Sequence, residues 1–120
     1  MEQRSETRIE RNLSIYVHIH ACKENPNLVG VSIPCQATDF SPHGLSYKSD
    51  LLLSPGSLVN ITIGIEHPFS LYLLLCEVRW EFEHGGKLIK GLKFLEGEYS
   101  ELKRWIKEFD SIFEEDSNSN

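Results

Sequence analysis

The sequence predicts a mainly β fold: a small six-stranded antiparallel β-barrel with one C-terminal α-helix. Apolar and polar residues alternate in several short runs that are separated by turn residues, which is the pattern of half-buried strands. Only one stretch, close to the C-terminus, has the three- and four-residue spacing of an amphipathic helix. Many short strands with frequent turns favour a small barrel over a sheet of alternating strands and helices.

The length and composition indicate one globular domain. The chain has 120 residues, of which 40% are hydrophobic and 25% charged, and these values are ordinary for a domain that folds without staples. We expect a single domain over residues 1–113, with a flexible basic arm at 1–12, a barrel at 13–95 and a helix at 100–113. Residues 114–120 are acidic and amide-rich and are expected to form a disordered tail.

The first two strands follow the polar arm. Apolar residues alternate with polar ones from Leu13 to Ile19, and the alternation resumes at residues 29–37 after a turn at Asn25-Pro26-Asn27. Pro34 cannot donate a backbone hydrogen bond, so the second strand is expected to be an edge or to bulge there.

Four further strands and the helix complete the barrel. The turn at 41–44 and the later glycine-containing turns separate strands that we expect at residues 45–48, 59–63, 71–82 and 88–94. The helix should begin with Ser100 as its N-cap and lie across the barrel. Its apolar face is formed by Leu102, Trp105, Ile106, Phe109, Ile112 and Phe113.

Charge and cysteine content exclude several classes of protein. The net charge of −6 argues against a nucleic-acid-binding surface. The three cysteines are isolated in the sequence, which indicates neither a disulfide framework nor a zinc ribbon and favours the reducing cytoplasm. No apolar run is long enough for a signal peptide or a membrane span, so a cytoplasmic protein without membrane insertion is expected.

We also expect neither a metal site nor an active site. His18 and His20 could chelate a metal with Cys22, but no second group of ligands is recognisable, and a solvent-facing strand explains the two histidines better. No nucleophile with a base and no glycine-rich phosphate loop occurs, so the chain is not expected to be an enzyme or to need a cofactor.

Two sequence motifs stand out. Arg4 and Arg8 form an Arg-x-x-x-Arg pair in the arm, and Asp39, Ser41 and Gly44 form an Asp-x-Ser-x-x-Gly turn. In this order the motifs resemble those of the PilZ domain family of bacterial second-messenger receptors. The resemblance continues at Pro55-Gly56-Ser57, Val78-Arg79-Trp80, Gly91-Leu92-Lys93-Phe94 and the terminal helix.

The resemblance implies a receptor for cyclic di-GMP. The implied ligand-binding residues are Arg4, Arg8, Asp39, Ser41 and Gly44, with Trp80 as a weaker candidate and Arg11 excluded. An arginine fork suits the O6 and N7 acceptors of guanine, and the carboxylate of Asp39 suits its N1 and N2 donors. Ser41 can bond phosphate or its own turn, and Gly44 is expected to adopt a positive φ.

The implied mechanism is ordering of the arm upon binding. Capture of the nucleotide by Arg4 and Arg8 would pin the arm against the barrel and create a surface for a partner protein, whose identity the sequence does not reveal. The alternative is a PilZ-fold protein–protein adaptor that does not bind nucleotide. Gln3 stands where some family members have a further arginine, which leaves open whether one or two nucleotides bind.

Overall fold

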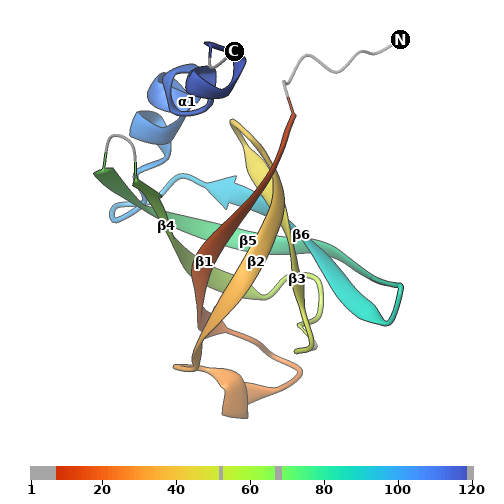
Figure 1. Cartoon of the computed structure of the whole chain (residues 1–120). Coiled ribbons are helices and arrows are strands. Elements are labelled where there is room, and N and C mark those ends of the chain that lie inside the picture. The colour runs from red at the N-terminus through yellow and green to blue at the C-terminus, as the bar shows by residue number, and fades with distance from the viewer. Residues whose placement is uncertain (1–7, 52, 67–68, 119–120) are drawn as a thin grey trace, which may run out of the picture.

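The protein folds as a closed six-stranded antiparallel barrel with one helix across its end (Figure 1). The computed structural model describes residues 8–51, 53–66 and 69–118. The strand order around the barrel is β1-β2-β3-β6-β5-β4. The elements are β1 (Ile9–Ala21), the short 3-10 helix η1 (Pro26–Leu28), β2 (Ser32–Ser41), β3 (Gly44–Ser49), β4 (Leu58–Glu66), β5 (Phe69–His84), β6 (Lys87–Leu95) and α1 (Leu102–Asn118). The predicted fold class is thereby confirmed.

The alternating pattern of the sequence produces the two faces of the barrel wall. In β1, Ile15, Val17 and Ile19 are completely buried in the barrel core, whereas the intervening Tyr16 and His18 are exposed. Each buried aliphatic side chain contributes roughly 1.5–3 kcal/mol relative to an exposed one. The period of two in the sequence therefore determines which face of β1 lines the core.

One short part of the barrel wall pairs on one side only. Residues 32–35 of β2 pair with β1, but β3 joins β2 only from the pair Gln36 and Lys48 onward. Pro34 lies in this segment, where no β3 partner requires its missing N–H. The prediction that Pro34 occupies an edge position is confirmed at this place.

Helix α1 closes the barrel through an aromatic cluster centred on Trp105. The Trp105 ring is completely buried. Its centroid lies 5.3–6.1 Å from those of Tyr72, Phe94, Phe109, Phe40 and Phe113. Such ring contacts add stabilisation beyond the burial of apolar area. The predicted apolar face of the helix thus closes the core, except that Ile106, which was assigned to this face, is 38% exposed.

The ends of the two terminal elements differ from the prediction. Strand β1 begins at Ile9 rather than at Leu13, so residues 9–12 are not a flexible arm; a β-bulge between Glu10 and Leu13 hides the strand period. The helix begins at Leu102, and the hydroxyl of Ser100 accepts a hydrogen bond from the N–H of Leu75 rather than marking the first helical turn.

The C-terminal end of the helix also extends beyond its predicted limit. Its backbone continues to Asn118, so the tail predicted at 114–120 is helical over residues 114–118. This stretch has no apolar residue that would predict packing, but it also has no glycine or proline that would end a helix. The predicted arm residues 1–7 and the last two residues lie outside the described part of the chain.

An ion pair with a buried cation joins the adjacent strands β5 and β6, where Glu81 and Lys90 are direct partners. The ammonium of Lys90, which is completely buried, lies 3.2 Å from a carboxylate oxygen of Glu81. The same oxygen accepts a hydrogen bond of 3.0 Å from the N–H of Leu53, in the connection between β3 and β4. The pair therefore attaches this connection to the barrel.

The ion pair leads to a stability prediction. Glu81→Gln should lower the free energy of unfolding by about 3 kcal/mol, because it keeps an oxygen for Leu53 but leaves the buried charge of Lys90 without a counter-ion. The double variant Glu81→Gln/Lys90→Met should recover most of this loss. Urea denaturation of both variants checks the prediction, and equal stability of the two would contradict it.

Candidate functional site

Three strands carry β-bulges at the same level of the barrel. The pairing register shifts in β1 between Glu10 and Leu13, in β2 between Ala37 and Asp39, and in β5 between Val78 and Trp80. The regular strands β3 and β6 run between the bulged ones. A bulge bends its strand and redirects side chains, and bulges are common beside functional sites. Because three bulges lie at one level, the outer wall departs there from regular strand geometry.

The bulges align one continuous row of paired residues around the wall. From β1 to β5, the direct partners in this row are Glu10, Asp39, Ser46, Gly91 and Trp80. Directly paired residues of antiparallel strands project to the same face. Asp39 and Trp80 therefore face the same surface across three strand spacings, about 14 Å.

Arg8 and Asp39 form an ion pair at the β2 end of this row. The Nη1 atom of Arg8 donates to the Oδ1 atom of Asp39 at 2.8 Å. The side chains are 59% and 23% exposed, so the Arg8 guanidinium remains accessible to solvent while Asp39 is partly sheltered. The structure thus brings together two predicted site residues that are 31 positions apart. Arg4 lies outside the described residues.

Ser41 and Gly44 form the β2–β3 turn beside the ion pair. Ser41 is only 3% exposed, and its hydroxyl donates to the carbonyl of Gly44 at 3.3 Å. The backbone carbonyl of Ser41 accepts a hydrogen bond of 3.1 Å from the indole N–H of Trp105. The side-chain hydroxyl and the backbone carbonyl of Ser41 are therefore both engaged within the protein.

Gly44 is required for a different reason from the predicted one. The described glycines with positive φ are Gly30, Gly56, Gly85 and Gly86, and Gly44 is not among them. A Cβ atom at position 44 would lie 2.4 Å from the carbonyl oxygen of Leu92 on β6. The expectation of a positive φ was wrong, because the constraint at Gly44 is the close approach of two backbones.

Trp80 lies at the other end of the row and covers Gly91. A Cβ atom at position 91 would lie 2.1 Å from the Trp80 ring, so the absence of a side chain allows the indole to lie directly on β6. The Trp80 side chain is 42% exposed, and its centroid is 5.4 Å from that of Phe82, which is also exposed. The surface therefore ends in an aromatic platform.

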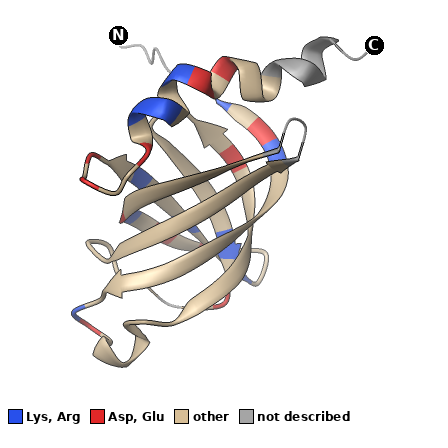
Figure 2. Cartoon of the chain, turned by 90° about the vertical axis from the view of Figure 1, so that its left-hand side faces the viewer, with Lys and Arg blue, Asp and Glu red and all other residues tan. Residues whose placement is uncertain are grey.

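The outer surface around the row is rich in cations. Lys48 on β3, Lys93 on β6 and Arg79 in the β5 bulge are exposed, and Arg79 lies 4.0 Å from a carboxylate oxygen of Glu77. Figure 2 shows that charged residues of both signs also occupy the first turns of α1. Together with Arg8, these cations lie near the row, and the carboxylates of Glu10, Asp39 and Glu77 lie among them. Exposed cations of this kind can contact an anionic ligand.

The sequence indicated Asp39 and Trp80 in the row but not the residues between them. Ser46, Gly91 and Phe82 were not proposed as site residues. Gly91 within a strand signals a close approach, and Phe82 is two positions after Trp80, on the same face of a strand. No sequence signal places Ser46 opposite Gly91, since their pairing joins strands that are distant in the chain.

The histidines provide no metal site within the described residues. No group of three or more potential metal ligands occurs in this part of the chain. Exposed His18 contacts the hydroxyl of Ser32 through its Nδ1 atom at 2.7 Å. The placement of His18 on a solvent-facing strand is therefore confirmed. In addition, no helix in the described ranges is long and apolar enough to cross a membrane.

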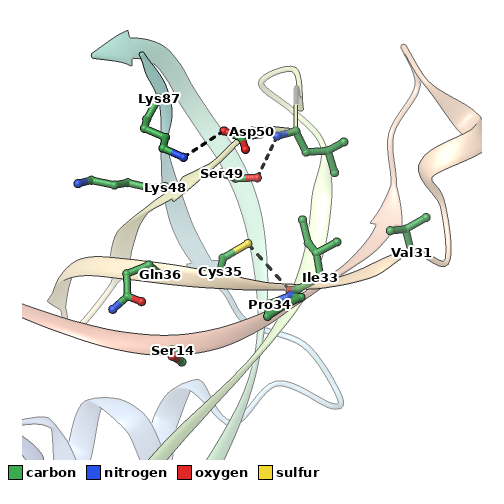
Figure 3. Close-up of a pocket in the computed structure, with 11 residues that line it drawn as sticks. Ser14, Val31, Ile33, Pro34, Cys35, Gln36, Lys48, Ser49, Asp50 and Lys87 are labelled. Atoms are coloured by element: carbon green, nitrogen blue, oxygen red, sulfur yellow. Dashed lines mark hydrogen bonds and ion pairs between the residues drawn. The ribbon is translucent and has the colours of Figure 1, made fainter. Parts of the chain in front are cut away.

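A separate cavity of about 750 Å³ lies where β2 and β3 diverge (Figure 3). Its lining includes Ile33, Cys35, Ser49 and Lys87, and none of the predicted ligand-binding residues. In Figure 3 the thiol of Cys35 lies beside the 49–51 segment. Burial raises the pKa of the Cys35 thiol, which therefore remains protonated at neutral pH and is a poor nucleophile. Because this cavity contains none of the predicted ligand-binding residues, its volume does not make it a better candidate site than the row on the outer wall.

The fold and surface define a six-stranded barrel with an apical helix and an arginine–carboxylate site beside the β2–β3 turn. The sequence matches the PilZ domain family over residues 2–108, so the chain belongs to this family. PilZ domains are receptor or adaptor domains rather than enzymes. No curated protein matches the sequence.

Solved structures of similar fold support the assignment. The chain is similar to the inhibitor of motility MotI from Bacillus subtilis, with a TM-score of 0.73 and 13% identity, and it covers 54% of that protein. It is also similar to the PilZ domain of YcgR from Escherichia coli, solved with c-di-GMP, with a TM-score of 0.70, 12% identity and 95% of that chain covered.

A third similar structure is the MrkH–c-di-GMP complex from K. pneumonia, with a TM-score of 0.72, 12% identity and 56% of that chain covered. These matches cover 100%, 97% and 100% of the present chain, respectively. The chain thus spans about half the length of MotI and MrkH. At these identities the likeness concerns the fold.

The geometry of the glycines provides a test of the turn. Gly44→Ala should destabilise the protein by about 2 kcal/mol, because the new methyl group meets a backbone oxygen that cannot move cheaply. Gly64→Ala is the matched control, since its Cβ would meet only a flexible side-chain atom of Leu71 at 3.4 Å. Thermal unfolding measures both, and equal effects would contradict the account of Gly44.

Proposed function

We propose that the protein is a non-catalytic receptor that binds cyclic di-GMP on the outer wall around the Ser46–Gly91 pair. The observation that carries the proposal is the pairing of Arg8 with Asp39 beside the β2–β3 turn, at 2.8 Å. Membership of the PilZ family and the c-di-GMP complexes of YcgR and MrkH support it. No cofactor is needed for this function.

The chemistry of the ligand fits the distribution of donors and acceptors. A guanidinium fork matches the O6 and N7 acceptors of guanine, and a carboxylate accepts from its N1 and N2 groups. Asp39 supplies one of these complementary groups from β2, and Arg8 supplies the other from the position just before β1. The exposed cations Lys48, Lys93 and Arg79 are available to contact the two phosphates of the ligand.

The free protein holds both groups ready at little cost. Because the Arg8 side chain is 59% exposed, the Arg8–Asp39 pair lies at the surface and stabilises the fold by only about 0–1 kcal/mol. A ligand that offers a donor to Asp39 and an acceptor to Arg8 can replace this contact without a large loss. Arg4 is proposed to join the ligand together with the residues before Arg8, so the proposed ordering upon binding concerns only that part of the arm.

The remaining predicted residues are proposed to shape the site. Ser41 shapes the turn because its hydroxyl donates to the carbonyl of Gly44. Gly44 shapes it because the absence of a side chain allows the close approach to the backbone of Leu92. Trp80 offers an exposed face on which a purine can stack, an interaction worth about 1–3 kcal/mol per base. The Trp80 platform lies across the row from Asp39, within the span of a compact dinucleotide.

A second surface favours a partner protein as the reader of the signal. Tyr16, Thr62 and Leu73 are direct partners across β1, β4 and β5, and the first and third of these side chains are at least half exposed. Exposed apolar residues on one sheet face are typical of protein interaction sites. A PilZ-fold adaptor that uses this face without binding nucleotide is the alternative function.

The proposal predicts the effect of removing either charged group. Arg8→Ala and Asp39→Ala should each weaken cyclic di-GMP binding by about 1.5–3 kcal/mol, the contribution of a charge-assisted hydrogen bond. Both variants should remain folded, because neither side chain belongs to the core. Isothermal titration calorimetry measures the affinities, and circular dichroism verifies folding.

His18→Ala is the control, because the His18 side chain is exposed on β1 and its Nδ1 atom contacts the hydroxyl of Ser32. The His18→Ala variant should bind cyclic di-GMP with the affinity of the wild type. Full affinity of folded Arg8→Ala and Asp39→Ala would refute the assignment of these residues. No binding by the wild type would favour the adaptor, and conversion of the nucleotide during the titration would indicate an enzyme.

A further inference from the structure

Trp105 contacts the candidate site from the interior of the protein. Its indole N–H donates to the carbonyl of Ser41 across 64 positions of sequence, at 3.1 Å, and the ring is completely buried. Ser41 belongs to the β2–β3 turn and pairs there with Gly44. A residue of helix α1 therefore holds the backbone of the turn that carries the Asp-x-Ser-x-x-Gly motif.

The aromatic surroundings of the Trp105 indole make its N–H depend on the Ser41 carbonyl as acceptor. Its neighbours are aromatic rings, among them Phe40, Phe94 and Phe109, which offer no strong acceptor to the N–H. A buried donor without an acceptor is costly, so the indole orientation and the position of the Ser41 carbonyl depend on each other. The bond thus determines how the helix and the turn meet.

Two further contacts join α1 to the same site. Phe40, between Asp39 and Ser41 in the chain, has its ring centroid 5.5 Å from that of Phe113. The guanidinium of Arg11, in the β1 bulge three residues after Arg8, lies 5.2 Å from the centroid of the same Phe113 ring. In Figure 1 the β2–β3 turn and α1 occupy the same end of the barrel. Helix α1 thereby contacts both motif-bearing segments.

We propose that Trp105 is a positioning residue that links helix α1 to the nucleotide-binding turn. Movement of the Ser41 carbonyl upon ligand binding would then alter the seating of α1, and the seating of α1 would alter ligand affinity to the same extent, because such coupling is reciprocal. The ligand-dependent half of this inference rests on the proposed function, whereas the positioning half concerns the protein without ligand.

The first arm of the test uses the protein without nucleotide. Trp105→Phe removes the indole N–H but keeps an aromatic ring in the cluster. Tyr72→Phe is the matched control, because it removes another hydrogen bond between barrel and helix, from Tyr72 to Glu108 at 2.6 Å. Amide NMR signals of Ser41, His43 and Gly44 should shift and broaden in Trp105→Phe and remain in place in Tyr72→Phe. Unchanged signals in a folded Trp105→Phe variant would overturn the positioning role.

The second arm uses cyclic di-GMP as the probe. Trp105→Phe should weaken binding about threefold to tenfold, the equivalent of one net hydrogen bond, while Tyr72→Phe should bind like the wild type. A role in stability alone would lower the unfolding temperature of both variants but leave both affinities unchanged, and that result would overturn the link.

A third readout requires no change at Trp105. The chain has two tryptophans, so its NMR spectrum contains two indole N–H signals, which Trp80→Phe assigns in the ligand-free protein. Saturation of the wild type with cyclic di-GMP should shift the Trp105 signal and slow hydrogen exchange in α1. An unaffected Trp105 signal despite binding would contradict the link, whereas no binding by the wild type would refute the proposed function and leave the positioning role to the first arm.

Discussion

The backbone pairing of Ser46 with Gly91 is the constraint on which the candidate site depends. It joins β3 to β6 at the level where β1, β2 and β5 each carry a bulge, and it places Asp39 and Trp80 on either side of one surface. Because Gly91 has no side chain, the Trp80 ring lies against the strand instead of standing away from it. Any residue larger than glycine at this position would displace the platform.

The same arrangement explains why polar and apolar requirements do not conflict in so small a domain. The inward faces of the strands supply a continuous apolar core, and α1 covers one end of it with an aromatic cluster. The groups proposed to face the ligand lie outside this core, beside a turn whose backbone is held by Trp105 and by the close contact with Leu92. Rigid support of an exposed site is what precise recognition requires.

The sequence predicted those features that depend on local patterns. The alternation around Ile15 and Val17 revealed a strand and its buried face, and the spacing of Trp105 and Phe109 revealed the helix face, because burial follows directly from these periods. The family motifs indicated Arg8 and Asp39. The sequence did not reveal the bulges, because the extra residue interrupts the period of two. Strand β1 was consequently expected to begin at Leu13 rather than at Ile9.

Features that depend on non-local pairing also escaped prediction. Gly44 was expected to need a positive φ, but its actual constraint is the backbone of Leu92, which is 48 positions away and on another strand. The hydrogen bond of Trp105 to Ser41 and the burial of the Lys90 ammonium next to Glu81 likewise follow from the barrel register. A period identifies the face of a side chain, but it does not identify the side chain's partner on another strand.

Amide chemical-shift changes in a titration with cyclic di-GMP map the binding surface most directly. The largest changes are expected along the row at Asp39, Ser46, Gly91 and Trp80, and Thr62 on the β1–β4–β5 face should be unaffected. Saturable changes confined to the row would support the site. Changes centred on the Thr62 face or on the cavity beside Cys35, with the row undisturbed, would contradict it.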